Sequence, residues 1–365
     1  MTSKLKLLVA SSVVTLTMLG ASPVFAAGTT QGTGITNNVN VNYQVGGVAQ
    51  TQQTAADTFV VDRKIIFLLS EKAPVGTTSV TPGQAAQQTT FILSNTSNDT
   101  LDFTITPSQI VGGTAAHGGT DAFNVTNLLV CLDANADAVC DAAATATLTI
   151  DNLIADDNRT ILIVGDVPLI ATNGQVAGVT LTATALNANG TAITAATDAT
   201  VNGAGTVETI FADAAKSGNG GTSATRDGID VATDDYTVSA AVLSVFKTSR
   251  IISDSVSTSN FKSVPGATVE YCISVANGAG GATATNITIS DLVPTNTTYL
   301  ASSIRVNGTV PSPGAGQTGS GGTAVPDAVD VDTGSFGTPA NTVAGTLANV
   351  AGSGSSALIF RVTLN

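Results

Sequence analysis

The sequence predicts an all-β protein with two tandem β-sandwich domains. Apolar and polar residues alternate with a period of two along residues 264–308, the pattern of strands with one buried face, and a similar pattern recurs at 81–111. The composition agrees, because only 11% of the residues are charged and the 43% that are hydrophobic suffice for substantial cores. At 365 residues, the chain has the length of about two or three domains.

Residues 1–26 have the features of a secretory signal peptide. Lys4 and Lys6 form a basic start, residues 7–19 form a short apolar run, and Ala26 precedes the expected cleavage. An ordinary N-terminal helix is the alternative. No later segment reaches about 18 consecutive apolar residues, so no transmembrane segment is expected in the mature chain. We therefore expect an exported protein, located extracellularly, at the cell surface or in the periplasm.

The charge balance bears on the expected partners. The chain has 13 basic and 26 acidic residues, and removal of Lys4 and Lys6 with the leader leaves a net charge of −15. Nucleic acid is not expected as a partner, because phosphate contacts need clustered Lys and Arg, which the sequence lacks. An acidic exported chain suits divalent cations instead.

Residues 27–240 are expected to form an N-terminal sandwich with long loops. Its first part, 27–62, is predicted to be a hairpin. The hairpin either completes its own domain, which we prefer because self-pairing orders no second chain, or pairs with the sheet edge of a neighbouring molecule, as donor strands do. A surface loop is expected at 216–225 and the hinge near Ala240. Further strands are expected at 65–69, 91–95, 101–105, 127–132, 146–150, 160–164 and 176–186.

Residues 241–365 are expected to form the C-terminal sandwich. Apolar and polar residues alternate along 269–276, and the turn at 277–281 predicts a hairpin with 287–289. The N-terminal domain repeats this theme, because the step from Asn95 to Ile105 equals that from Asn277 to Ile287. The remaining expectations are an exposed loop at 311–328 and a final strand at 358–364.

Many positions of the C-terminal domain follow one pattern in order and spacing: Pro265, Gly266, Val269, Tyr271, Ile273, Val275, Asn277, Asn286, Ile287, Ile289, Asp291, Leu292, Pro294, Thr298, Tyr299, Val306, Asn307 and Gly308. At these residues the stretch 241–365 resembles the DUF11 conserved repeat domain of bacterial surface and secreted proteins. The resemblance implies an immunoglobulin-like β-sandwich in an extracytoplasmic protein. It implies no known catalysis and no known ligand.

One loop has the ligand spacing of a calcium site. Asp133, Asn135, Asp137 and Asp141 occupy loop positions 1, 3, 5 and 9, and Val139 offers its carbonyl. The likeness to EF-hand loops is partial, because Ala stands at positions 6 and 12. The alternative is a solvated acidic turn whose side chains bond their own backbone. With calcium as the cofactor, we expect weak binding, with a dissociation constant of about 10⁻⁴ to 10⁻³ M.

The three cysteines fall into two groups. Cys131 and Cys140 flank the predicted calcium loop, and in an oxidising compartment they either form a disulfide that braces the loop or stay separate. Pairing requires their Cα atoms to lie within about 7 Å. Cys272 is left over, and without a neighbouring His it is expected to be a packed side chain rather than a nucleophile.

The remaining titratable residues indicate no reaction. His117 is the only histidine, which removes all paired-His metal sites, so zinc is not expected. A lone His in a Gly-rich loop is expected to be solvated. A catalytic pair of carboxylates, as in glycosidases, is defined by its separation in space, so counting acids does not exclude one. However, with 4 Tyr and no Trp the chain has little aromatic surface on which a sugar could stack. An acidic cluster beside Arg226 is expected to be a solvated loop: Asp227, Asp230, Asp234 and Asp235.

These observations predict a non-catalytic, secreted cell-envelope protein. It is expected to be a structural or adhesive surface component. Self-assembly and bracing by calcium are further parts of this hypothesis. The alternative is an extracellular binding module that presents sandwich-end loops to a glycan or protein ligand. The expected partners are other envelope proteins or a second copy, through donor-strand or edge-strand contacts.

Overall fold

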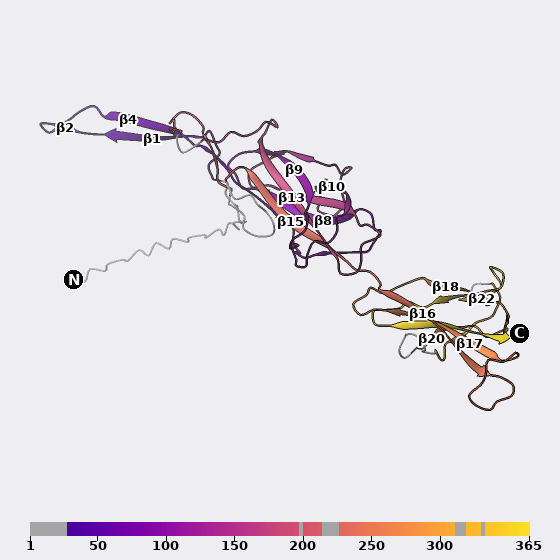
Figure 1. Ribbon diagram of the computed structural model, residues 1–365. Helices are drawn as coiled ribbons and strands as arrows, with labels where there is room; N and C mark the ends of the chain where they lie inside the picture. The colour runs from indigo at the N-terminus through magenta and orange to yellow at the C-terminus, as the bar shows by residue number, and fades with distance from the viewer. Residues whose placement is uncertain (1–27, 197–199, 214–225, 311–318, 330–332) are drawn as a thin grey trace, which may run out of the picture.

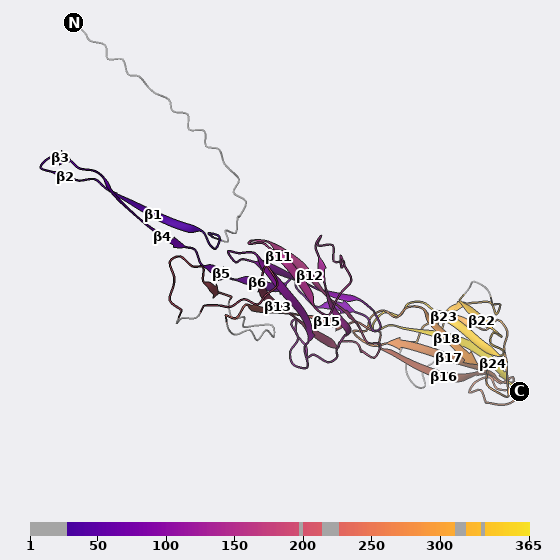
Figure 2. The same cartoon turned by 90° about the horizontal axis from the view of Figure 1, so that it is seen from above.

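The computed structural model describes residues 28–196, 200–213, 226–310, 319–329 and 333–365. The chain is elongated, with a projecting hairpin followed by an N-terminal and a C-terminal sandwich (Figure 1, and from above in Figure 2). Every regular element in these residues is a β-strand, which confirms the predicted all-β fold. The predicted signal peptide and the predicted loop at 216–225 lie outside the described residues.

The N-terminal sandwich packs the sheet β10-β12-β8-β6 against the sheet β11-β9-β13-β15-β7. Between them lie fully buried side chains such as Phe91, Phe103 and Tyr236, whose removal from water stabilises the domain. Each strand predicted for this domain overlaps an observed one. The strands are β5 Arg63–Ile65, β6 Phe67–Glu71, β7 Thr78–Val80, β8 Gln87–Asn95, β9 Leu101–Gln109, β10 Thr126–Asp133, β11 Leu148–Leu153, β12 Asn158–Asp166, β13 Val176–Asn187, β14 Thr209–Phe211 and β15 Ile229–Val238.

The C-terminal sandwich packs the sheet β16-β17-β24-β20-β21, with β19 beside β24, against the sheet β18-β23-β22. Its core includes Val343 and Phe360. Across three neighbouring strands, the buried carboxylate of Glu270 pairs with Arg250 at 2.6 Å and with Arg361 at 2.9 Å. The strands are β16 Leu243–Ser253, β17 Thr268–Asn277, β18 Ile287–Leu292, β19 Thr297–Tyr299, β20 Arg305–Gly308, β21 Thr323–Ala324, β22 Gly334–Phe336, β23 Thr342–Leu347 and β24 Ser355–Leu364.

The predicted pairing of β17 with β18 is wrong. β18 lies in the opposite sheet and pairs with β23, while β17 pairs with β16 and β24. In the N-terminal sandwich, β8 and β9 are likewise consecutive strands of opposite sheets. Alternation does not tell which sheet a strand joins, because both sheets of a sandwich bury one face. The two turns are therefore crossovers between sheets.

A buried asparagine holds the crossover of the C-terminal sandwich. Asn277 Nδ2 donates to the carbonyl of Ala282 at 2.7 Å and to that of Val350 at 3.0 Å. Its Oδ1 accepts the N–H of Val242 at 2.9 Å. One side chain thus joins the crossover turn, the entry to β16 and a segment that precedes β24.

Asn95 does the same in the N-terminal sandwich. Its Nδ2 donates to the carbonyl of Asp99 at 3.0 Å and to that of Leu153 at 2.8 Å. Its Oδ1 accepts the N–H of Ser97 at 3.0 Å. The equal spacing that follows Asn95 and Asn277 therefore reflects a buried asparagine at the crossover between the two sheets of each sandwich.

The first hairpin stands apart from both sandwiches. β1 Gly34–Val41 pairs with β4 Gln53–Val60, and β2 Gln44–Val45 pairs with β3 Val48–Ala49 at its tip, where Gly46 and Gly47 both adopt the positive φ that a tight turn requires. All residues of β1 are exposed, and the hairpin projects beyond the sandwich (Figure 1). The preferred prediction, that this hairpin completes its own domain, is wrong, because β1 and β4 pair only with each other among the described residues.

A short connection joins the two sandwiches. β15 ends at Val238 and β16 begins at Leu243. Beside this connection, Asn173 Oδ1 accepts the N–H of Ala240 at 2.8 Å, and Asn173 Nδ2 donates to the carbonyl of Gly280 at 3.2 Å. One side chain of the N-terminal sandwich therefore contacts both the connection and a C-terminal turn.

Replacing Asn277 with Ala is expected to lower the free energy of unfolding of the C-terminal sandwich by about 1–3 kcal/mol, because the Ala282 carbonyl and the Val242 N–H lose their side-chain partner. Urea unfolding of the full chain, followed by circular dichroism, measures this change. Asn349→Ala, an exposed position of the same domain, is the control and is expected to stay within about 0.5 kcal/mol of wild type. Equal stability of the two variants would contradict the role given to Asn277.

Candidate functional site

The acidic stretch predicted to be a solvated loop forms most of strand β15. Asp230, Asp234 and Asp235 are buried, so that prediction is wrong for these three, whereas Asp227 precedes the strand and is exposed. The three carboxylates accept backbone N–H groups: Asp230 from Leu69, Asp234 from Asp235, and Asp235 from His117, each at 2.7 Å. Such hydrogen bonds offset the cost of burying an acid, and those to Asp230 and Asp235 come from segments distant in sequence.

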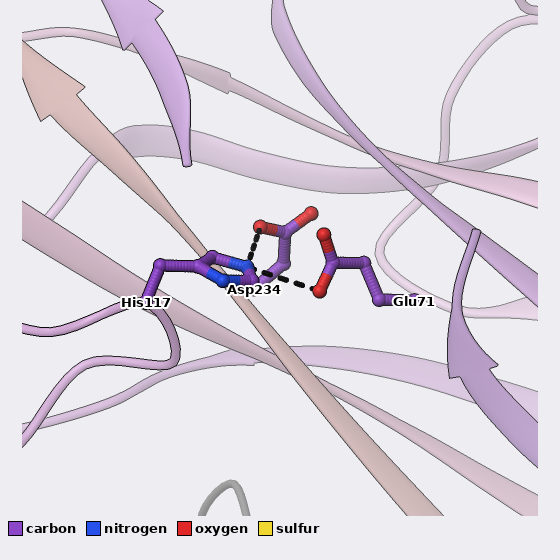
Figure 3. Close-up of side chains that lie close together, drawn as sticks. All are labelled: Glu71, His117 and Asp234. Carbon is purple, nitrogen blue, oxygen red and sulfur yellow. Dashed lines mark ion pairs between the residues drawn. The ribbon is translucent and has the colours of Figure 1, made fainter. Parts of the chain in front are cut away.

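Glu71, His117 and Asp234 converge at one edge of the N-terminal sandwich (Figure 3). His117 Nε2 lies 3.0 Å from Glu71 Oε2 and 3.4 Å from Asp234 Oδ1. Glu71 ends β6 of one sheet, Asp234 lies on β15 of the other, and His117 lies on the loop between β9 and β10. Within the described ranges, this is the only group of three His, Cys, Asp or Glu residues whose ligand atoms all lie within 4.8 Å of one another.

Strand pairing leaves room for His117 at this edge. β7 pairs with β15 only from Tyr236 onward, so the preceding part of that edge is open to the loop. There the His117 N–H bonds Asp235 Oδ2, while the ring reaches Asp234, whose side chain points to the opposite face of the strand. The His117 side chain is only 19% exposed, so the prediction of a solvated histidine is wrong.

Burial sets the electrostatics of the cluster. It raises the pKa of Asp234 to about 7, and the negative charge of Glu71 acts in the same direction. Glu71 Oε1 accepts the N–H of Gly76 at 2.7 Å, which leaves Oε2 for His117. Asp235 Oδ1 is buried and has no hydrogen-bond partner in the described part of the chain. Three carboxylates therefore share one edge with a single imidazole.

A cavity of about 400 Å³ lies beside the cluster. Glu71 and Asp234 line it, together with Asp133 of the predicted calcium loop. Lys72 also lines it, and its Nζ donates to Thr160 Oγ1 at 3.0 Å. The cavity thus joins the cluster to the predicted calcium loop, and its lining carries more acidic than basic groups.

The predicted calcium loop bonds its own backbone. The two carboxylate oxygens of Asp133 accept the N–H groups of Asp137 and Ala138, both at 3.1 Å. Asn135 Oδ1 accepts the N–H of Asp137 at 3.3 Å, and Asp137 Oδ1 accepts that of Val139 at 2.9 Å. These are the hydrogen bonds of the acidic-turn interpretation. Calcium at this loop stays a prediction.

A disulfide closes the base of this loop. Cys131 and Cys140 are bonded, with their Cα atoms 5.6 Å apart. Asp141 follows directly, and its carboxylate accepts the N–H of Ala134 at the other end of the loop. Because the disulfide and this hydrogen bond act on both ends, they restrict the conformations of the loop.

Cys272 on β17 is the one described cysteine outside a disulfide. It is buried in a small cluster with Val310, Ala357 and Ile359. Burial raises the pKa of its thiol, which disfavours the thiolate that a nucleophile needs. This geometry agrees with the prediction of a packed side chain.

An apolar groove opens between the two sheets of the C-terminal sandwich. β16 and β18 are edge strands of their sheets, and a cavity of about 470 Å³ lies between them. Val245, Ile273 and Ile289 are among the side chains that line it. Lys247 Nζ bridges the groove to Asp291 Oδ1 at 2.7 Å. The groove presents apolar side chains next to two unpaired strand edges.

No family model matches the chain, and no curated protein does. Among solved structures, the chain is similar to the C-terminal domain of the AgI/II polypeptide BspA from Streptococcus agalactiae, with a TM-score of 0.30, 10% identity, and coverage of 82% of this chain and 91% of that chain. It is also similar to the collagen adhesin CNA from S. aureus, with a TM-score of 0.22, 12% identity, and coverage of 82% and 80%. TM-scores of this size carry no argument about fold or function. Within the described ranges, no helix has the length and apolarity needed to span a membrane.

Sequence reasoning missed Glu71 altogether. It lies 46 positions before His117, and Asp234 lies 117 positions after His117, so no local motif marks the cluster. A single acid at the end of a strand is not distinctive in one sequence.

Calcium is expected to bind the loop weakly, with a dissociation constant of about 10⁻³ M, because the cation must compete with the N–H groups that now bond the Asp oxygens. Isothermal titration of the chain with calcium measures this constant. Asp137→Asn is expected to weaken binding further, whereas Asp151→Asn, an exposed acid on β11, is expected to leave it unchanged. Micromolar binding, or equal effects of both substitutions, would show that the loop is not a weak calcium site.

Proposed function

We propose that the protein is a non-catalytic structural or adhesive component of the bacterial cell envelope, and that copies join end to end. The observation that carries the proposal is the projecting β1–β4 hairpin with its exposed apolar face. We also propose that its C-terminal sandwich is a DUF11-like domain and that the chain is exported by its signal peptide. Calcium at the Asp133 loop is part of the proposal as a brace.

One face of the hairpin carries its large apolar side chains. Ile35 on β1 faces Phe59 on β4, and Val39 faces Ala55, so that these residues share a face. Val39 and Phe59 are each 51% exposed. An isolated two-stranded hairpin is at best marginally stable in water, so covering this face contributes stability that the hairpin lacks alone.

The low charge of the hairpin allows a second copy of the chain to cover its exposed face. The chain has a net charge of −13, so two copies repel each other over most of their surfaces. Between Gly34 and Val60 the hairpin has a single charged residue, Asp57, which pairs with Asn37 and lies between Ala55 and Phe59 on the same face. The hairpin can therefore approach another copy with little charge repulsion.

The groove between β16 and β18 is the site we propose for the hairpin of the next copy. It offers apolar side chains and two unpaired strand edges, the requirements for adding a strand from another chain. The hairpin and the groove are different surfaces, and the sandwich that bears the groove lies at the other end of the molecule (Figure 1). A contact between unlike surfaces leaves one surface free at each end of a pair, so further copies add and produce filaments unless the rotation between copies closes a ring.

Substitution of Phe59 by Asp is expected to abolish assembly, because it replaces a large exposed apolar side chain of this face with a second charge beside Asp57. Thr58→Asp places the same charge on the opposite face and is the matched control. In the groove, Val245→Asp is expected to abolish assembly and Ser244→Asp to preserve it. Light scattering coupled to size exclusion, with electron microscopy of the mature chain, measures the assemblies.

A mixture of the Phe59→Asp and Val245→Asp chains tests the polarity of the contact. Each chain keeps one intact surface, so the mixture is expected to form one-to-one dimers and no filaments. Assembly that survives both substitutions would overturn the hairpin contact. A wild-type chain that stays monomeric while it retains a glycan or protein ligand would favour the binding module instead.

A further inference from the structure

The three ligand atoms of the Glu71, His117 and Asp234 cluster have the mutual spacing of a metal site. Zinc binds His nitrogen and carboxylate oxygen at about 2.0–2.1 Å, so two ligands of a tetrahedral ion lie roughly 3.3 Å apart. His117 Nε2 lies 3.0 Å from Glu71 Oε2 and 3.4 Å from Asp234 Oδ1 (Figure 3). The atoms therefore need only small shifts to enclose an ion.

We propose that Glu71, His117 and Asp234 bind one divalent transition-metal ion of the zinc class. This site is distinct from the predicted calcium loop, and the proposal extends beyond the proposed function. An imidazole ligand favours zinc, cobalt or nickel over calcium and magnesium, which prefer oxygen ligands alone.

Unbalanced negative charge supports a cation at this position. The side chains of Glu71 and Asp234 are 9% and 4% exposed, and within the described ranges the only ion-pair partner of either is His117. Asp235 adds a third buried carboxylate, whose Oδ1 has no hydrogen-bond partner in the described residues. Buried charges need a partner, and a divalent cation neutralises more of this charge than one imidazolium does.

Backbone hydrogen bonds orient all three side chains. The Gly76 N–H holds Glu71 Oε1 at 2.7 Å, and the Asp235 N–H holds Asp234 Oδ1 at 2.7 Å. The His117 N–H bonds Asp235 Oδ2, which fixes the start of the histidine side chain. Outer contacts of this kind position metal ligands and raise affinity. The cluster is therefore arranged before any ion arrives.

The adjoining cavity of about 400 Å³ supplies access and space for water. Because Glu71 and Asp234 line the cavity, an ion reaches them without opening the sandwich. Three protein ligands leave one position of a tetrahedral ion for a water molecule from this cavity. A bound ion would link β6, β15 and the loop of His117, and so stabilise this edge.

The test uses chelator-treated full chain, titrated with zinc by calorimetry and with cobalt by visible absorption. We expect one ion per chain, the intense absorption of tetrahedral cobalt, and a higher midpoint of thermal unfolding with zinc. His117→Ala and Glu71→Gln are expected to weaken zinc binding by more than about 100-fold, beyond the 10- to 100-fold typical of outer-shell residues. Circular dichroism of each variant verifies folding.

Two controls separate this site from its neighbours. Lys72→Gln changes the same cavity without removing a ligand, and Asp137→Asn changes only the predicted calcium loop; both are expected to bind zinc as wild type does. The proposal is overturned if wild type binds no zinc, or if folded Glu71→Gln binds it as tightly as wild type. In that case His117 is only the positive partner of two buried carboxylates.

Discussion

Both sandwiches depend on one buried amide side chain at the point where the chain passes from one sheet to the other. Asn95 and Asn277 each donate to two backbone carbonyls and accept one backbone N–H, so each ties together backbone groups of separate segments. A hydrophobic side chain of similar size would fill the space but would remove the side-chain partner of each of these backbone groups. The position of each crossover, and with it the alignment of the two sheets, is fixed by this requirement.

Much of the strand content could be predicted from alternation, because a half-buried strand has to present apolar side chains at every second position. The pairing could not, since β17 has the same pattern whether its neighbour is β18 or β24. The acidic part of β15 could not be predicted either, because Asp230, Asp234 and Asp235 resemble a solvated loop in sequence. Their burial depends on backbone N–H groups, such as those of Leu69 and His117, that come close only in the folded chain.

The candidate site was predictable only in its separate pieces. The spacing of Asp133, Asp137 and Asp141 is local and visible in sequence, and so is the loop that Cys131 and Cys140 close. The cluster around His117 draws on two sheets and a loop, so its members are neighbours only after folding. A single histidine cannot form a paired-His site, but this count does not bear on an imidazole that acts together with carboxylates.

The flanking of β17 by β16 and β24 has a mechanical consequence. Both are antiparallel to β17, so they run in the same direction, and the chain enters β16 beside the N-terminal sandwich while β24 ends at the far tip (Figure 1). A pull along the long axis therefore drags β16 and β24 in opposite senses past β17. The ladder bonds between them are then loaded in shear and resist together, whereas bonds opened from one end break in succession.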